Sequence, residues 1–138
     1  MPPLRIGILG AARIAPTATL NPIKLNGDLT EKAVICSVAA RSPEKAAQFA
    51  AEHGIPRTHA SYEAMLADDE IDAVYCPLPN AYHAAVTIQA LQAGKHCLCE
   101  KPFANNAAEA MAVQRASEDS GCIAVEAFHP LHHPVAKR

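Results

Sequence analysis

The sequence predicts an α/β fold: a doubly wound parallel sheet with strand order 3-2-1-4-5-6, covered by helices on both faces. Three observations predict it. Short apolar segments suited to buried strands alternate with segments of helical periodicity along the whole chain. The connections between them are short, and 138 residues is the size of one domain. The first apolar segment stops at a glycine and is followed by a helical pattern, as in folds that bind phosphate groups.

The first strand and the loop after it lie in the stretch Leu4–Ala15. Free backbone N–H groups and the helix dipole at the start of the next helix favour a phosphate group. The dinucleotide fingerprint G-x-G-x-x-G reads G-A-A-R-I-A from Gly10, so Ala12 and Ala15 occupy the positions of the other two glycines. This degenerate motif alone leaves an ordinary strand–turn–helix equally open.

Capping residues and helix breakers predict the other elements. The first helix is expected to start near Arg13, with Pro16 in its first turn, and to end or kink at Asn21-Pro22, before a turn at Asn26-Gly27-Asp28. Later strands are expected at Ala33–Ala40, Arg57–Ala60, Ala73–Leu78, His96–Glu100 and Cys122–Phe128. The N-caps of the later helices are expected to be Ser42, Ser61, Asn80 and Asn106, the last with Glu109 in a start that resembles a capping box.

Bulk properties exclude several classes of protein. The net charge is −2 and the chain has no basic stripe with aromatic residues, so no nucleic-acid partner is expected. No apolar run has the length of a membrane span, and the first residues do not read as a signal peptide, so we expect no membrane contact and a cytoplasmic location. An odd number of cysteines, each in an apolar run, predicts five buried free thiols: Cys36, Cys76, Cys97, Cys99 and Cys122.

Two clusters raise the question of a metal ion. The acidic run Asp68-Asp69-Glu70 is interpreted as a solvated loop. The histidines near the end of the chain are His129, His132 and His133, and the prolines among them disturb any regular ligand spacing. We therefore predict no metal site.

Three motifs fall at the carboxyl ends of expected strands, namely Gly10–Ala15, the P-L-P-N-A-Y-H run Pro77–His83 and the A-G-K-H-C-L-C-E-K-P run Ala93–Pro102. Together they resemble the N-terminal domain of the Gfo/Idh/MocA oxidoreductases, over essentially the whole chain. The resemblance implies an NAD(P)-binding Rossmann domain at residues 1–128. It also implies that residues 129–138 begin a connection to a C-terminal substrate and oligomerisation domain that is absent from this chain.

The resemblance assigns roles to individual residues. Lys101 is the expected catalytic residue, since its ammonium group can bond a substrate oxygen and stabilise charge as hydride leaves carbon. Each residue also has a simpler interpretation: Asn80 as a helix cap, His83 as a structural histidine and Lys101 as a surface lysine. The residues expected to bind the cofactor are Gly10, Ala12, Arg13, Ile14, Arg41, Ser42, Pro79, Asn80, His83, Glu100, Lys101 and Pro102.

The end of the second expected strand bears on the choice of cofactor. It reads Ala39-Ala40-Arg41-Ser42, without the carboxylate that bonds the ribose hydroxyls of NAD. Arg41 and Ser42 offer donors to a 2′-phosphate, which favours NADP(H) and leaves NAD(H) as the alternative. They have a simpler interpretation too, as an exposed arginine and a helix cap.

The expected activity is hydride transfer between the cofactor and a secondary alcohol of a sugar or polyol, in a homo-oligomeric full-length protein. The fragment alone is expected to be inactive. A free-standing dinucleotide-binding or regulatory module without catalysis is the alternative, and a protein-interaction domain on the same fold is a third.

Overall fold

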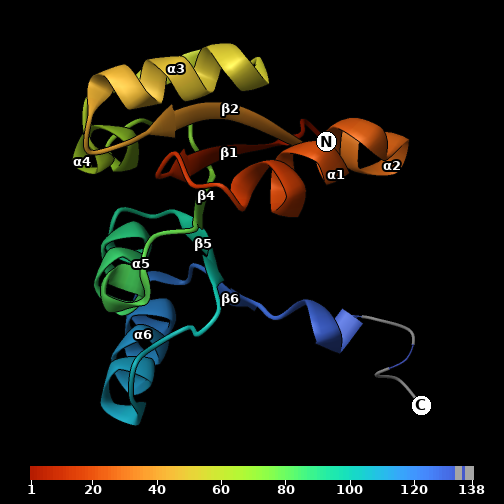
Figure 1. Ribbon diagram of the computed structural model, residues 1–138. Helices are drawn as coiled ribbons and strands as arrows, with labels where there is room; N and C mark the ends of the chain where they lie inside the picture. Colours follow the sequence, from red (N-terminus) through yellow and green to blue (C-terminus); the bar gives the residue numbers. More distant parts are fainter. Residues whose placement is uncertain (133–134, 136–138) are drawn as a thin grey trace.

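The computed structural model describes residues 1–132 and Val135. Six parallel strands form one sheet in the order β3-β2-β1-β4-β5-β6, which confirms the predicted topology (Figure 1). The strands are β1 Leu4–Leu9, β2 Ala33–Ala39, β3 Arg57–His59, β4 Ala73–Cys76, β5 His96–Glu100 and β6 Ala124–Ala127. The strand order reverses direction between β1 and β4, and ligands of such sheets bind beyond the carboxyl ends at this point.

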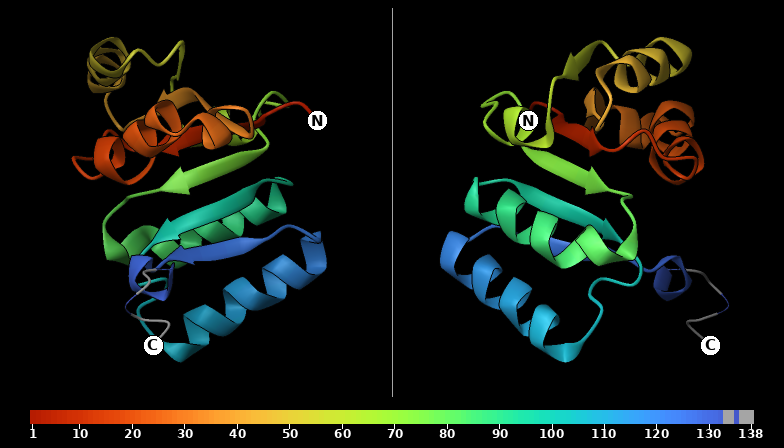
Figure 2. Two further views of the ribbon diagram at one scale, coloured as in Figure 1. Left: turned by 90° about the vertical axis from the view of Figure 1, so that its right-hand side faces the viewer. Right: turned by 60° about the vertical axis from the view of Figure 1, so that its left-hand side comes forward.

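Helices cover both faces of the sheet. They are the π-helical turn η1 Pro16–Leu20, α1 Asn21–Leu25, α2 Gly27–Thr30, α3 Pro43–His53, α4 Tyr62–Leu66, the 3₁₀ turn η2 Asn80–Tyr82, α5 His83–Gln92, α6 Ala107–Ser120 and the 3₁₀ turn η3 His129–His132. Figures 1 and 2 show α1 and α3 beside β1 and β2, and α5 and α6 on the other face, beside β4, β5 and β6. No described helix has the length and hydropathy needed to cross a membrane.

Each face of the sheet has its own apolar core. On one face η1 and α3 pack against β1 and β2, with Leu20 and Phe49 among the buried contacts. On the other face α4 and α5 pack against β4 and β5. Gly7 interrupts the apolar run of β1 because Met65 of α4 lies directly over it: a Cβ there would be 2.5 Å from the Met65 sulfur.

One half of the sheet has a partly open face. Leu98 of β5 and Val125 of β6 point away from α5 and α6, and with Ile123 they remain exposed. An apolar groove of about 520 Å³ lies here, between these strands and the helices η1, α1 and α2.

Several local predictions are confirmed. The side chains of Ser42, Ser61 and Asn106 each accept a hydrogen bond from a backbone N–H in the first turn of α3, α4 and α6. In addition, the structure places Gly54 and Gly121 at the ends of α3 and α6, in the left-handed conformation that favours glycine. Glu109 accepts from Asn105 N rather than from Asn106 N, so the capping box closes one residue earlier than its usual pattern.

The first helical segment differs from prediction. It begins at Pro16 rather than near Arg13, and it continues through Asn21-Pro22, where the π geometry of η1 changes to the α geometry of α1. Asn21 N–H donates to Pro16 O, five residues back, and this wider π turn accommodates Pro22, which has no N–H of its own. The expected turn at Asn26 is the start of α2, where the Asn26 side chain accepts from Asp28 N.

Two further expectations need correction. Cys76, Cys97 and Cys99 are buried, but Cys36 and Cys122 are only half-buried, each packed against the buried residues of an apolar core; all five thiols are free. The acidic run is not simply solvated. Asp68 accepts from His59 at 3.0 Å and pairs with Arg57 at 3.2 Å, and buried Lys95 donates to its carbonyl oxygen.

Part of the histidine cluster lies outside the described residues. His133 and Pro134 are among the undescribed residues, as are residues 136–138. The described His129 is exposed in η3.

Candidate dinucleotide site

The loop after β1 has the geometry of a phosphate-binding turn. Gly10 has φ +113°, which strains any residue with a Cβ, and a Cβ there would also lie 3.0 Å from the Leu78 side chain. Gly10 N–H donates to Ala39 O, and Ala12 N–H donates to Gly10 O. Among the described residues, no acceptor is found for the N–H groups of Ala11, Arg13 and Ile14. These donors fit a pyrophosphate.

The residues after β2 lie beside this loop, because β2 pairs with β1. Arg41 is exposed, and Ser42 is half-buried at the cap of α3. The Ser42 hydroxyl donates to Glu44 at 2.6 Å and accepts from Lys45 N at 3.3 Å. Its hydrogen is therefore already used, and Arg41 is the stronger of the two candidates for a 2′-phosphate.

The end of β5 places Lys101 at the same edge of the sheet. Its side chain is exposed, and the peptide bond to Pro102 is cis. The preceding Glu100 is buried, and its carboxylate accepts from Tyr75 OH at 2.8 Å and from Lys101 N at 3.3 Å. Burial and the bond to Glu100 raise the pKa of Tyr75, so the phenol keeps its proton and remains the donor.

Asn80 and His83 follow β4. Asn80 is not a helix cap: it is the first residue of η2, and Pro79 precedes it without a side-chain capping bond. Its amide side chain is therefore not engaged as a cap, and the residue is exposed at the edge beside Pro79. The His83 ring is 1 % exposed and points inside, with Nδ1 2.6 Å from Pro102 O and Nε2 2.6 Å from Leu78 O.

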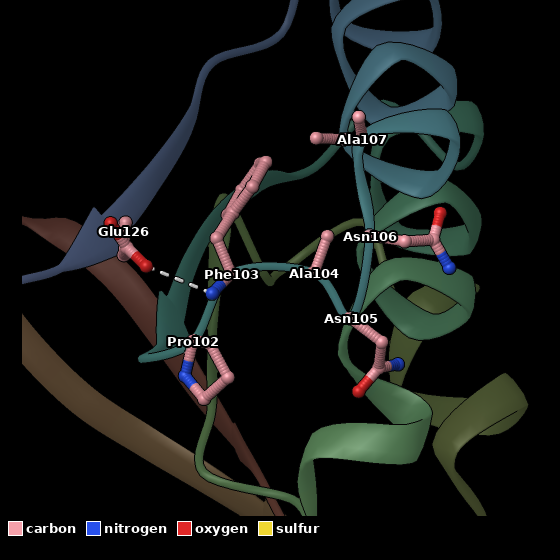
Figure 3. A pocket seen from close by; sticks show the side chains of 8 residues that line it. Pro102, Phe103, Ala104, Asn105, Asn106, Ala107 and Glu126 are labelled. Atoms are coloured by element: carbon pink, nitrogen blue, oxygen red, sulfur yellow. Dashed lines mark hydrogen bonds between the residues drawn. The ribbon is translucent and has the colours of Figure 1, made fainter.

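A pocket adjoins the loop that follows Lys101. It has a volume of about 280 Å³ and lies between the end of β6 and the start of α6. Figure 3 shows Phe103 and Glu126 at its wall, where Phe103 N–H donates to the Glu126 carboxylate at 2.9 Å. The volume lies at the lower limit of the roughly 300–1,000 Å³ typical of small-molecule sites, and we assign this pocket no ligand.

The structure therefore brings most of the predicted residues to one edge. The loops that bear Gly10, Arg41, Asn80 and Lys101 all leave the carboxyl ends of β1, β2, β4 and β5, with β1 next to β4. His83 is the exception, because its ring lies beneath the loops rather than at their surface.

Sequence reasoning missed two residues at this site. Tyr75 and Glu126 contact no ligand position, but each holds a residue next to Lys101 or Pro102. A signal was available for Tyr75, since a hydroxyl in an all-apolar strand requires a buried partner. For Glu126 the signal was a carboxylate at the end of an apolar strand.

The strand order reverses beside a glycine turn, and backbone N–H donors and a lysine lie at the same edge of the sheet. These features define a dinucleotide-binding α/β domain. Residues 4–128 match the family described as "Oxidoreductase family, NAD-binding Rossmann fold". The chain belongs to this Gfo/Idh/MocA family.

Relatives of known activity share this domain. The chain is 39 % identical over 135 residues to D-xylose 1-dehydrogenase (NADP(+)) 2 of Haloferax volcanii, covering 98 % of this chain and 40 % of the relative. It is 36 % identical over 132 residues to dTDP-3,4-didehydro-2,6-dideoxy-alpha-D-glucose 3-reductase of Actinomadura kijaniata, covering 96 % and 38 %.

A solved structure agrees with the fold. The 3-ketoreductase KijD10 of Actinomadura kijaniata, in complex with NADP and TDP-benzene, superposes with a TM-score of 0.88 at 33 % identity over 98 % of this chain and 40 % of that chain. This chain therefore spans about two fifths of the length of these relatives.

Proposed function

We propose that this chain is the NADP(H)-binding domain of an oxidoreductase that acts on a sugar, a polyol or a related secondary alcohol. The observation that carries the proposal is the convergence of the Gly10 turn, Arg41 and Lys101 at one edge of the sheet. The names of two relatives, a sugar dehydrogenase and a sugar-nucleotide reductase, support the substrate class, and NADP in the first name and in KijD10 supports the cofactor.

The bound cofactor would supply the hydride chemistry, and the chain would orient it. The N–H groups after Gly10 would hold the pyrophosphate and Arg41 the 2′-phosphate. Lys101 would act at the substrate, where its ammonium group would donate to the reacting oxygen and stabilise the negative charge that develops there. The other expected contacts, from Asn80 and Glu100, would flank the nicotinamide.

The domain division remains part of the proposal. Residues 1–128 would form the cofactor domain, and residues 129–138 would begin the connection to a second domain. In a full-length protein that domain would close the substrate site and form a homo-oligomer.

Titration of cofactor fluorescence tests the cofactor assignment. We expect saturable binding of NADPH and weaker binding of NADH, because Arg41 is a donor to the 2′-phosphate and no carboxylate follows β2. Tighter binding of NADH would contradict the NADP assignment, and binding of neither would contradict the proposed function.

A non-catalytic dinucleotide-binding module is the second candidate. The exposure of Lys101 favours it for the 138-residue chain, because hydride transfer requires a substrate held in position and shielded from water. We expect cofactor binding and no turnover by this chain across a panel of sugars and polyols. Oxidation of any of them with saturable kinetics would show that the chain needs no second domain.

The role of Lys101 is tested in a full-length version. Lys101→Ala should lower kcat while leaving NADPH affinity largely unchanged, because the exposed ammonium group would act on the substrate rather than on the cofactor. An unchanged rate would identify Lys101 as an ordinary surface lysine.

A further inference from the structure

His83 is the most constrained polar side chain beneath the candidate site. It is the first residue of α5 and only 1 % of its surface is exposed. Its two ring nitrogens lie 2.6 Å from two carbonyl oxygens, those of Leu78 after β4 and Pro102 after β5. The imidazole therefore spans the space between the two loops that bear Asn80 and Lys101.

The ring contacts a carbonyl oxygen at each of its two nitrogens. A carbonyl oxygen can only accept a hydrogen bond, so the ring donates to at least one of the two loops and lies equally close to the other. A single side chain therefore contacts both loops at once.

We propose that His83 is a positioning residue: its ring bridges Leu78 O and Pro102 O and so sets the spacing between the Asn80 and Lys101 loops. This deepens the proposed function, because Lys101 is the residue proposed to act on substrate. His83 itself touches neither cofactor nor substrate in this arrangement.

The two contacts also explain why His83 is needed rather than another polar residue. An imidazole has two nitrogens on different edges of one rigid ring and can reach both loops at once, whereas an amide side chain carries both hydrogens on one nitrogen. Asparagine or glutamine could therefore hold one loop but not both.

The first test uses the unsubstituted 138-residue chain and needs no ligand. A ring N–H that is buried and hydrogen-bonded exchanges slowly with solvent and is observed by nitrogen-15 NMR. We expect a slowly exchanging ring N–H on His83, because the ring is buried between two carbonyl oxygens. Fast exchange of every ring N–H of His83 would overturn the proposal.

The second test compares His83→Asn with His53→Asn, a control in the last turn of α3. Amide hydrogen exchange should become about tenfold faster at Tyr82, Lys101 and Phe103 in His83→Asn, while β1–β3 are unchanged, because the contact to one of the two loops is lost. The control should leave these amides unchanged. A uniform rise across the sheet would show a general structural role and contradict the proposal; His83→Gln replaces His83→Asn if the latter does not fold.

NADPH affinity tests whether the contacts of His83 matter for function. His83→Asn should bind NADPH about tenfold more weakly than the unsubstituted chain, and His53→Asn should bind equally well. Unchanged affinity in His83→Asn would contradict a positioning role. If the unsubstituted chain does not bind NADPH, the proposed function fails, and the NMR and exchange measurements still decide whether His83 holds the two loops.

Discussion

The two halves of the carboxyl edge are built in different ways. After β1 and β2 the backbone itself makes the site: Gly10 adopts φ +113° and Ser42 caps α3, while Arg41 extends into solvent. After β4 and β5 buried side chains hold the loops from beneath, with Tyr75 bonded to Glu100 and His83 bonded to two carbonyl oxygens.

The difference has a physical consequence. A side chain that is exposed in the folded chain contributes little to the stability of the fold. Its replacement can therefore change ligand binding and leave stability nearly unchanged. A buried donor or acceptor that loses its partner carries its full desolvation cost. Substitutions of the exposed Arg41 in the first half should therefore alter cofactor choice alone, and those of the buried polar side chains in the second half should alter stability and binding together.

Tyr75→Phe should have the largest effect. It removes the donor to the buried Glu100 carboxylate, and we expect the free energy of unfolding to fall by about 3 kcal/mol. Urea unfolding followed by circular dichroism measures it. Tyr82→Phe is the matched control, because Tyr82 is 51 % exposed and should change little. Equal stabilities of the two variants would show that the Tyr75–Glu100 bond does not hold the second half.

Arg41→Ala should act on binding alone. NADPH affinity should weaken by about 1–3 kcal/mol, the range for a hydrogen bond to a charged group, while NADH affinity and stability stay nearly unchanged. Fluorescence titration with both cofactors provides the measurement. Arg115→Ala, on α6, controls for loss of positive charge. A parallel loss of NADH affinity would mean that Arg41 does not recognise the 2′-phosphate.

Asp72→Asn should have a smaller effect, at the opposite edge of the sheet. Asp72 accepts from Arg5 Nη2 at 2.7 Å, and Arg5 holds the pKa of this carboxyl at about 2, below its usual 3.8. A lowered pKa means that the stabilisation is complete above about pH 4 and is lost as the pH falls towards 2. Because the Arg5–Asp72 pair is partly exposed, we expect Asp72→Asn to lower the free energy of unfolding by about 1 kcal/mol at pH 7.

The pH dependence of stability, compared with NADPH affinity, shows whether the Arg5–Asp72 pair acts independently of the cofactor site. In urea unfolding the difference between Asp72→Asn and the unsubstituted chain should shrink between pH 4 and pH 2, and NADPH affinity at pH 7 should be equal in both. A stability difference that persists at pH 2 would show that the ion pair is not its cause.

Thiol titration gives the smallest signal. Cys36 and Cys122 are half-buried and the other three cysteines are buried, so the folded chain should react first at these two thiols and the denatured chain at all five. A denatured count below five in protein prepared without oxidant would contradict the free thiols. Fast reaction of all five in the folded chain would show that the β4–β5 half opens readily.

Local chemistry explains where sequence reasoning succeeded. Ser42, Ser61 and Asn106 cap helices because a side-chain oxygen next to the first turn can satisfy its free N–H groups, whatever the rest of the fold does. Asn80 looks the same in sequence but is not a cap, because the loop after β4 continues as a 3₁₀ turn before α5 begins. Pro22 likewise looked like a helix end, and a π turn accommodated it.

By itself the sequence determined the strand order, because alternating buried strands and helices joined by right-handed crossovers have few arrangements. It also determined that the Gly10, Asn80 and Lys101 loops share one edge, since parallel strands all end there. Only the tertiary structure decided how the loops are held. Tyr75 meets Glu100 across 25 positions and His83 meets Pro102 across 19, and such partners depend on strand register and on the depth at which α5 packs, which no local pattern encodes.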